Sequence, residues 1–418
     1  MQMADSVFMF LATMMVWLMT PGIALFYGGM VKSKNVLNTA MHSYMPLAVI
    51  SILWVLIGYS LSFSPGNSLL GGLDWVGLKD VGFAPGPYSE TIPHSLFMLF
   101  QMTFAVLTVS IIAGGIAERM KFSAFLIFTI LWSLFVYAPV AHWVWGGGWL
   151  AELGTLDFAG GNVVHISSGV AGLVLAIMLG KRKESGDSAP HNLPLTFLGG
   201  SLIWFGWYGF NVGSALTINE VAMNVFVNTA VAAAAGIIGW LIVEYMANKK
   251  ATLLGAVSGA ISGLVAITPA CGFVTPASSI IIGVIGGAVC FWGVFFLKNK
   301  LGYDDALDAF GLHGIGGTWG GIATGLFATT SVNESGANGL FYGDFNLLWK
   351  QLVAIIATYI FVAVVTYIVA KAINLFVPLR VSEEDESMGL DLTLHGEKSL
   401  SRINLKGGCP YVRDFNEK

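Results

Sequence analysis

Long stretches of almost uninterrupted apolar residues recur along the whole chain, and they constrain its fold more than any other feature. A helix needs about 20 mostly apolar residues to cross the hydrocarbon core of a bilayer. Only 11% of the residues are charged, whereas soluble domains average about 25%. This pattern excludes a soluble enzyme, a disordered chain and a nucleic-acid-binding protein. It predicts an all-α membrane protein with eleven transmembrane helices, at roughly 6–31, 37–63, 91–116, 122–144, 161–180, 194–214, 221–247, 252–269, 277–298, 308–330 and 346–377.

Basic residues are distributed unevenly among the loops that join these segments. Cytoplasmic loops of membrane proteins carry an excess of Lys and Arg. Loops after even-numbered segments hold only Lys79. Loops after odd-numbered segments hold eleven basic residues: Lys32, Lys34, Arg119, Lys121, Lys181, Arg182, Lys183, Lys249, Lys250, Lys298 and Lys300. We therefore expect the N-terminus outside, a membrane domain over residues 1–377 and a cytoplasmic tail over residues 378–418. The first residues carry no basic region of the kind that opens a signal peptide.

The fifth and tenth segments resemble each other. An aspartate, Asp157, precedes His165 by eight residues, and Asp305 precedes His313 by the same spacing. Glycines follow both histidines at matching offsets: Gly169 and Gly172, then Gly317 and Gly320. Because five segments per copy is an odd number, the second copy must be inverted in the membrane, as in many transporters. The copies would span about 1–185 and 190–330, with the eleventh helix at 346–377 outside the repeat. Chance similarity between two glycine-rich helices is the alternative.

Ionisable side chains inside a bilayer are costly, and they usually face a cavity or a partner. Under the inverted repeat, the imidazoles of His165 and His313 would approach each other and share a proton as a coupled pair, which could relay protons. The alternative is that each histidine only bonds a neighbouring helix. Asp157 and Asp305 stand at helix starts, where a carboxylate caps free N–H groups. For Asp157, on the outer side, a second role in attracting cations stays open.

A set of aromatic residues and one serine lies near the outer ends of the predicted helices. A cation site needs the face of an aromatic ring and a hydroxyl acceptor nearby. Trp145 ends the fourth segment and Ser214 the sixth, both on the outer side. Phe100 and Phe104 lie one helical turn apart in the outer half of the third segment. Packing or an interfacial aromatic belt is the alternative for each of them.

Many strings, in one order from the first segment into the tail, resemble the ammonium transporter/methylammonium permease/Rhesus (Amt/Mep/Rh) family, and its bacterial Amt branch most closely. They are TPGIALFYGG (20–29), FQMTFA (100–105), GGIAERMKFSA (114–124), AHWVWGGG (141–148), LDFAGGNVVHISSGVAGL (156–173), HNLP (191–194), WFGWYGFNVGSA (204–215), GAISGLVAITPACG (259–272), DAFGLHGIGGTWG (308–320) and RVSEEDESMGLDLTLHGE (380–397). Two features depart from the family pattern: Met102 and Thr103 differ from some relatives, and residues 407–418 have no counterpart in it.

The resemblance implies a homotrimer in the cell membrane that transports ammonium and methylammonium, is not an enzyme and needs no cofactor. It also implies a pore in each protomer and a regulatory tail near which a PII-type signal protein binds. Matched residue by residue, it assigns an outer ammonium site to Trp145, Phe104 and Ser214, with Asp157 nearby; a phenylalanine gate to Phe104 and Phe210, approached past Phe100; and a pore lining to His165, His313, Trp207 and Thr268.

Three other functions compete with transport. An ammonium sensor with little flux would use the same fold, and a Rhesus-like gas channel would lack the complete outer site of Trp145 and Ser214. An intramembrane hydrolase would need a nucleophilic serine with a base and an oxyanion hole, and no GxSxG-like motif falls in a predicted segment.

Overall fold

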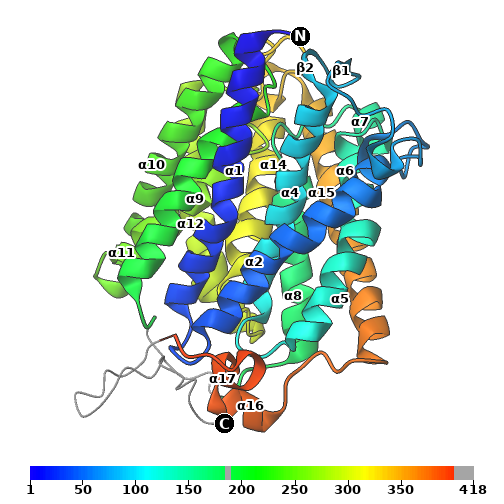
Figure 1. Cartoon of the computed structure of the whole chain (residues 1–418). Helices are drawn as coiled ribbons and strands as arrows, with labels where there is room; N and C mark the ends of the chain where they lie inside the picture. The colour runs from blue at the N-terminus through cyan, green and yellow to red at the C-terminus, as the bar shows by residue number, and fades with distance from the viewer. Residues whose placement is uncertain (184–189, 400–418) are drawn as a thin grey trace.

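The computed structural model describes residues 1–183 and 190–399, which form a bundle of long, roughly parallel helices (Figure 1). The helices of the first half are α1 (Met3–Met30), α2 (Val36–Leu53), η1 (Trp54–Gly58), α3 (Tyr59–Phe63), α4 (His94–Ile116), α5 (Phe122–Trp132), η3 (Ser133–Tyr137), α6 (Ala138–Val144), α7 (Trp149–Leu153), η4 (Gly161–Ile166) and α8 (Ser167–Leu179). Those of the second half are α9 (Leu193–Gly213), α10 (Glu220–Asn248), α11 (Leu253–Ile267), α12 (Pro276–Trp292), η5 (Gly293–Leu297), α13 (Lys298–Leu301), η6 (Phe310–Gly314), α14 (Ile315–Phe327) and α15 (Phe345–Asn374).

Short elements close the two ends of the bundle. Near the N-terminus lie η2 (Val76–Leu78), the antiparallel strands β1 (Pro85–Gly86) and β2 (Ser89–Pro93), and η7 (Leu340–Tyr342). At the opposite end lie α16 (Glu383–Met388) and α17 (Leu390–His395), below the bundle in Figure 1.

Eight helical segments of the described chain are long and apolar enough to cross a membrane. Seven of them coincide within a few residues with segments predicted from hydropathy, and the fourth, Phe122–Leu153, continues through α7 beyond the predicted end at 144. An all-helical, multi-span architecture is confirmed. The three other predicted segments are helical as well: α9, the shorter α11, and η6 continued by α14. Hydropathy predicted these helices because a segment inside a bilayer must satisfy its backbone hydrogen bonds internally and present apolar side chains to lipid or to neighbouring helices.

Helices from the two halves of the chain pack against each other. α1 packs along α9, and η4 with α8 packs against η6 with α14. Glycine permits the second contact, since a Cβ on Gly169 would collide with the backbone of Gly314. The two histidine-bearing segments therefore lie backbone to backbone in the centre of the bundle.

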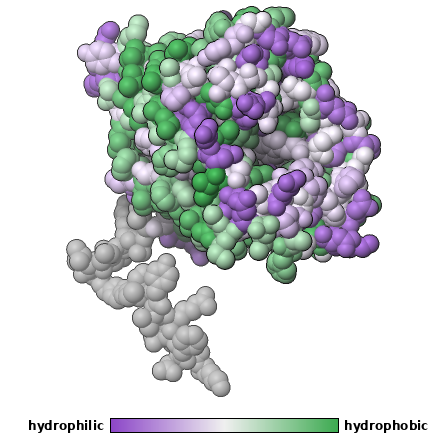
Figure 2. All heavy atoms as spheres, turned by 90° about the horizontal axis from the view of Figure 1, so that it is seen from above, coloured by the Kyte–Doolittle hydropathy of each residue, from purple (hydrophilic) through white to green (hydrophobic). Residues whose placement is uncertain are grey.

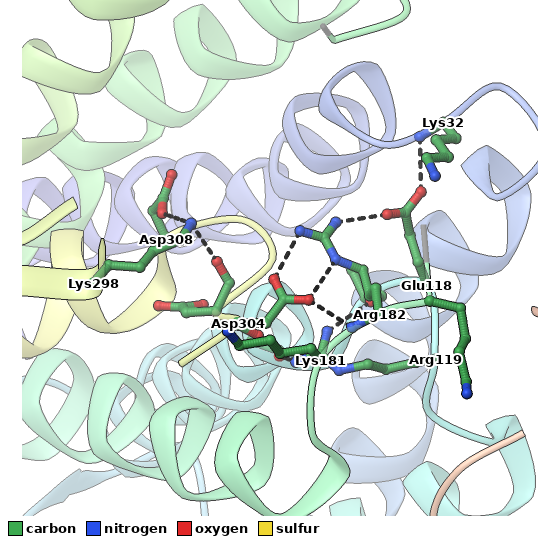
Figure 3. A network of polar contacts seen from close by, with 12 residues as sticks. Lys32, Glu118, Arg119, Lys181, Arg182, Lys298, Asp304 and Asp308 are labelled. Carbon is green, nitrogen blue, oxygen red and sulfur yellow. Dashed lines mark hydrogen bonds and ion pairs between the residues drawn. The ribbon is translucent and has the colours of Figure 1, made fainter. Parts of the chain in front are cut away.

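A network of charged side chains joins the loops at the end of the bundle opposite the N-terminus (Figure 3). Arg182 donates from Nε and Nη2 to the two carboxylate oxygens of Asp304, at 2.9 and 2.8 Å, and from Nη1 to Glu118 at 2.6 Å. Glu118 also accepts from the backbone of Lys32 and from the amide of Asn35, both at 2.9 Å. These loops follow the first, third, fifth and ninth predicted segments, which the basic residues had placed on one side.

The network holds its carboxylates in the charged form. Burial alone would raise the pKa of Asp304, but the hydrogen bonds and charge of Arg182 lower it to about 2. Burial opposes ionisation of Glu118 as well, and Asn35 together with Arg182 brings its pKa below the usual value. Nearby, the fully buried Arg119 donates to the carbonyls of Gly115, Ala117 and Asp304.

Replacing Arg182 by Gln should lower the free energy of unfolding by about 3 kcal/mol, because it leaves two buried carboxylates without their cation. Thermal unfolding of purified protein in detergent measures this loss as a lower midpoint. The matched control is Lys183→Gln, since both side chains of the Lys183–Glu383 pair are exposed and an exposed pair contributes little to stability. Equal midpoints for the two variants would contradict a stabilising role of the network.

The first part of the tail is docked on the same loops. Arg380 donates to the carbonyls of Leu179 and Lys181 and to the carboxylate of Glu386. The carboxylate of Asp391 accepts the backbone N–H of Asn38, at 2.8 Å, in the first turn of α2. The tail therefore caps a helix of the membrane domain with its own aspartate. Residues 407–418, which match no family pattern, lie outside the described residues.

Candidate functional site

A cavity of about 270 Å³ opens at the end of the bundle that carries the N-terminus. Figure 2 shows this end from above, with hydrophilic and pale residues over the centre and the right of the view, around a hollow, and with hydrophobic residues gathered mainly at the left. The cavity is lined by Tyr88, Phe97, Gln101, Phe104, Val144, Trp145, Phe158, Ser214 and Leu216. The structure therefore brings together Trp145, Phe104 and Ser214, three of the residues predicted to form an outer site, although they come from different helices.

The geometry of these three residues suits a small cation. Trp145 follows α6, and its Nε1 donates to the carbonyl of Asp157 at 2.9 Å, which fixes the indole. The rings of Trp145 and Phe104 stand perpendicular, with centroids 5.8 Å apart. Ser214, which follows α9, donates its hydroxyl proton to the carbonyl of Phe210 at 2.8 Å. Its oxygen lone pairs are then oriented and can accept a hydrogen bond from a ligand.

Phe104 and Phe210 form a stacked pair below the cavity. Their centroids are 4.2 Å apart with an interplanar angle of 28°, and both side chains are almost completely buried. Phe100 packs edge-on against Phe104, at 4.9 Å between centroids, and lies behind it instead of on the cavity wall. The Phe104–Phe210 pair therefore separates the outer cavity from the interior of the bundle.

The two histidines lie directly beyond this pair. The Nδ1 atoms of His165 and His313 are 3.2 Å apart, and the rings stack with centroids 5.2 Å apart. Only one of the two Nδ1 atoms can carry the proton of this contact, so the rings are opposite tautomers that share one hydrogen bond. The Nε2 of His165 is buried without a hydrogen-bond partner among the described residues. It is a free polar atom beside the phenylalanine pair, whose Phe210 ring lies 5.9 Å away.

Both histidines sit in π-helical turns, η4 and η6, which local propensity does not predict. Each turn is preceded by its aspartate. The carboxylate of Asp157 accepts three backbone N–H groups, from Gly160, Gly161 and Asn162, at 2.6–2.8 Å. That of Asp305 accepts two, from residues 309 and 310, at 3.1 and 2.8 Å. The capping role expected for both aspartates is thus present, and Asp157 does not line the outer cavity.

Trp207 and Thr268 support the histidine pair from the side. The indole of Trp207 stacks on His165 with centroids 5.4 Å apart, and its Nε1 donates to Thr268 Oγ1 at 2.9 Å. That hydroxyl also lies 3.3 Å from Asn211 Oδ1. These bonds fix the ring that faces the imidazole.

A second cavity of about 20 Å³ lies beyond the histidines, large enough for one water-sized molecule. Its wall is almost entirely apolar and consists of Met19, Ile23, Phe26, Tyr27, Leu107, Ile111, Ile203, Trp207, Ile261, Leu312 and His313. The one hydroxyl in this wall, on Tyr27, donates to the carbonyl of Ile111 at 3.2 Å. A small neutral molecule fits this cavity far better than a hydrated ion.

Sequence reasoning missed several of these wall residues. Gln101 and Phe158 in the outer cavity, and Tyr27 in the inner one, were not singled out. A signal existed for Gln101, because it lies three residues before Phe104 and therefore on the same face of the third helix. Tyr27 carried no comparable signal, since one aromatic residue in an apolar helix is most often packing.

If Ser214 belongs to the outer ammonium site that the family resemblance implies, replacing it by Ala should raise the ammonium concentration needed for half-maximal transport about tenfold, the effect of losing one hydrogen bond to a charged group. Maximal flux should change less, because the serine lies before the Phe104–Phe210 pair. The measurement is the concentration dependence of ammonium-evoked current in proteoliposomes. An equal loss of affinity and maximal flux would instead indicate that the serine only holds the end of α9 in place.

Comparison with known proteins gives three results. The sequence profile of the Ammonium Transporter Family matches residues 7–400. An ammonium transporter of Bacillus subtilis is 73% identical over 399 residues, which cover 96% of this chain and 99% of that protein, and the ammonium transporter Amt1 of Archaeoglobus fulgidus is 47% identical, with 92% and 96% covered. Among solved structures, Mep2 of Saccharomyces cerevisiae superimposes with a TM-score of 0.86 at 37% identity, covering 92% of this chain and 90% of that one.

Proposed function

Since the chain belongs to the Ammonium Transporter Family, a family of transporters and not of enzymes, we propose that it moves ammonium nitrogen inward across the cell membrane through the path just described. The observation that carries the proposal is the succession of parts from the outer cavity into the bundle. An open aromatic cavity leads to the Phe104–Phe210 pair, then to the His165–His313 pair, then to an apolar cavity of molecular size.

The outer cavity serves as the recruitment site. Ammonium is a hydrated cation at neutral pH, and the faces of Trp145 and Phe104 replace part of its hydration by cation–π contact, at about 0.5–2 kcal/mol each. Ser214 accepts one of its N–H bonds. Sodium and potassium cannot donate such a bond, and they have no proton to release. The same site accommodates methylammonium, which keeps three N–H donors.

Beyond the phenylalanine pair the nitrogen travels as ammonia. A bare ion would meet the cost of entering an apolar passage, whereas ammonia can accept or donate a hydrogen bond at the free Nε2 of His165. The proton left behind at the outer side is carried separately along the two imidazoles. Transfer of the proton in their shared Nδ1 contact converts each ring into its other tautomer.

The membrane arrangement that we propose has eleven spans with the N-terminus outside. The pairing of α1 with α9 and of the two histidine segments supports two inverted copies of five spans, with α15 as the eleventh. The loops that gather around Arg182 support a common, cytoplasmic side for the basic residues. The docked tail then lies at the cytoplasmic end of the pore as a regulatory segment.

The assembly that we propose is a homotrimer with one pore per protomer. The large apolar surface that the bundle exposes is suited to lipid and to neighbouring protomers alike. At the cytoplasmic end, the tail and loops present a polar surface for a soluble PII-type signal protein. Chemical cross-linking in native membranes, followed by mass measurement, tests the number of protomers.

The proposed function is tested by labelled methylammonium uptake into proteoliposomes, with the ammonium-evoked current recorded on the same preparation. Transport with the outer site intact gives saturable uptake that unlabelled ammonium inhibits. Uptake that rises linearly with concentration would indicate a gas channel. Ammonium binding without uptake would indicate a sensor.

A further inference from the structure

The wall of the outer cavity contains one polar side chain that has no part in the ammonium site proposed above. Gln101, on α4, lines the cavity with Phe104, Trp145 and Ser214. The side chain is only 8% exposed, and its Oε1 has no hydrogen-bond partner among the described residues. The other polar groups of the wall have partners, since Tyr88 donates to the carbonyl of Phe63 and Trp145 donates to that of Asp157.

A buried amide oxygen without a partner costs about 1–3 kcal/mol, and buried polar groups are almost always paired by protein, by water or by a ligand. The position of Gln101 at the wall of the outer cavity favours a ligand as the partner of its oxygen. Because it lies one helical turn from Phe104 on the same face of α4, its amide borders the space in front of the Phe104 and Trp145 rings. The oxygen itself is enclosed, and a half-turn about the last side-chain torsion, which is soft in glutamine, exchanges it with the amide nitrogen and turns it toward that space.

We infer that Gln101 is a second hydrogen-bond acceptor for ammonium in the outer cavity, an inference that rests on the proposed function. Ammonium has four N–H donors arranged as a tetrahedron. Ser214 Oγ accepts one and Gln101 Oε1 accepts another, while the aromatic rings face the remaining charge. Two oriented acceptors and two ring faces recognise a tetrahedral donor, which distinguishes ammonium from cations that have no N–H bonds.

The experiment compares three variants in proteoliposomes by the concentration dependence of ammonium-evoked current. Gln101→Met keeps the side-chain length without the acceptor, and the half-saturating ammonium concentration should rise about tenfold with maximal flux nearly unchanged. Gln101→Glu keeps the acceptor and adds a negative charge, so the half-saturating concentration should fall below that of the wild type as the introduced carboxyl ionises with rising pH. Thr103→Val is the control, because Thr103 donates to the carbonyl of Phe100 within α4 and does not line the cavity.

The thermal midpoints of the variants distinguish a loss of ammonium binding from a loss of folding stability. Gln101→Met removes an unpartnered buried oxygen, so its midpoint should not fall below that of the wild type. A half-saturating concentration unchanged in Gln101→Met, or one that shifts equally in Thr103→Val, overturns the inference. Failure of the wild type itself to take up labelled methylammonium would instead overturn the proposed function, and the two failures are distinguished by that one measurement.

Discussion

Replacing His165 and His313 together by Ala should lower the ammonium-evoked current at least about a hundredfold. Among the described residues, the two imidazoles are the only ionisable groups between the Phe104–Phe210 pair and the apolar inner cavity that could pass a proton by changing tautomer. Without them a proton must cross this region as a bare charge or not at all. A charge near the middle of a bilayer costs at least about 3 kcal/mol, which corresponds to about a hundredfold in rate.

The control for this experiment is uptake of labelled methylammonium by the same vesicles. The double variant should keep its elution volume but show a lower thermal midpoint, because two alanines leave a cavity where the buried imidazoles were packed. Current and uptake both equal to those of the wild type would contradict the proton relay. Single variants should lose the current as well, because one imidazole has no partner to which it can pass the proton.

Replacing Asp157 by Ala should lower the free energy of unfolding by about 4 kcal/mol. The carboxylate accepts three backbone N–H groups at the start of η4, and each buried donor left without a partner costs about 1–3 kcal/mol. The π-turn that carries His165 starts from these groups, so transport should fall with stability. The measurement is the midpoint of thermal unfolding in detergent, together with current in proteoliposomes.

Asp305→Ala is the matched control, because Asp305 caps the other histidine-bearing turn from the opposite end of the bundle with two N–H groups. It should show a smaller loss of stability of the same kind. If Asp157→Asn lowered the affinity for ammonium while leaving the thermal midpoint unchanged, the carboxylate would act by attracting the cation and not by capping the turn.

The helices were predictable because the bilayer dictates their length and polarity. The pairing of His165 with His313 was predictable as well, since matching Asp and His spacings in two halves of one chain imply equivalent places in the fold. The π-turns were not predictable, because a π-turn depends on how η4 and η6 fit against each other and on the aspartate oxygens that cap them. Neither dependence leaves a periodic signal in the sequence.

The charged network was likewise predictable only in part. Basic residues identified the side of each loop, yet nothing in the sequence indicated that Arg182 would bind both Glu118 and Asp304. Those partners are set by tertiary packing across distant loops. Gln101 lay inside a recognised string, FQMTFA, three residues before Phe104, so its helix face was predictable. That its oxygen has no hydrogen-bond partner among the described residues was not, because this depends on the tertiary surroundings of the amide.

The same network also constrains the order in which the protein can be completed during synthesis. Arg182 leaves the ribosome 122 residues before its main partner, Asp304. Until the ninth segment has been inserted, its guanidinium and the carboxylate of Glu118 can neutralise only each other. The cluster closes only when the second half of the chain has folded onto the first, and the docking of Arg380 follows last. A protein truncated before Asp304 would therefore lack the two-pronged carboxylate partner of Arg182, and the loops of its first half would stay unjoined to the second.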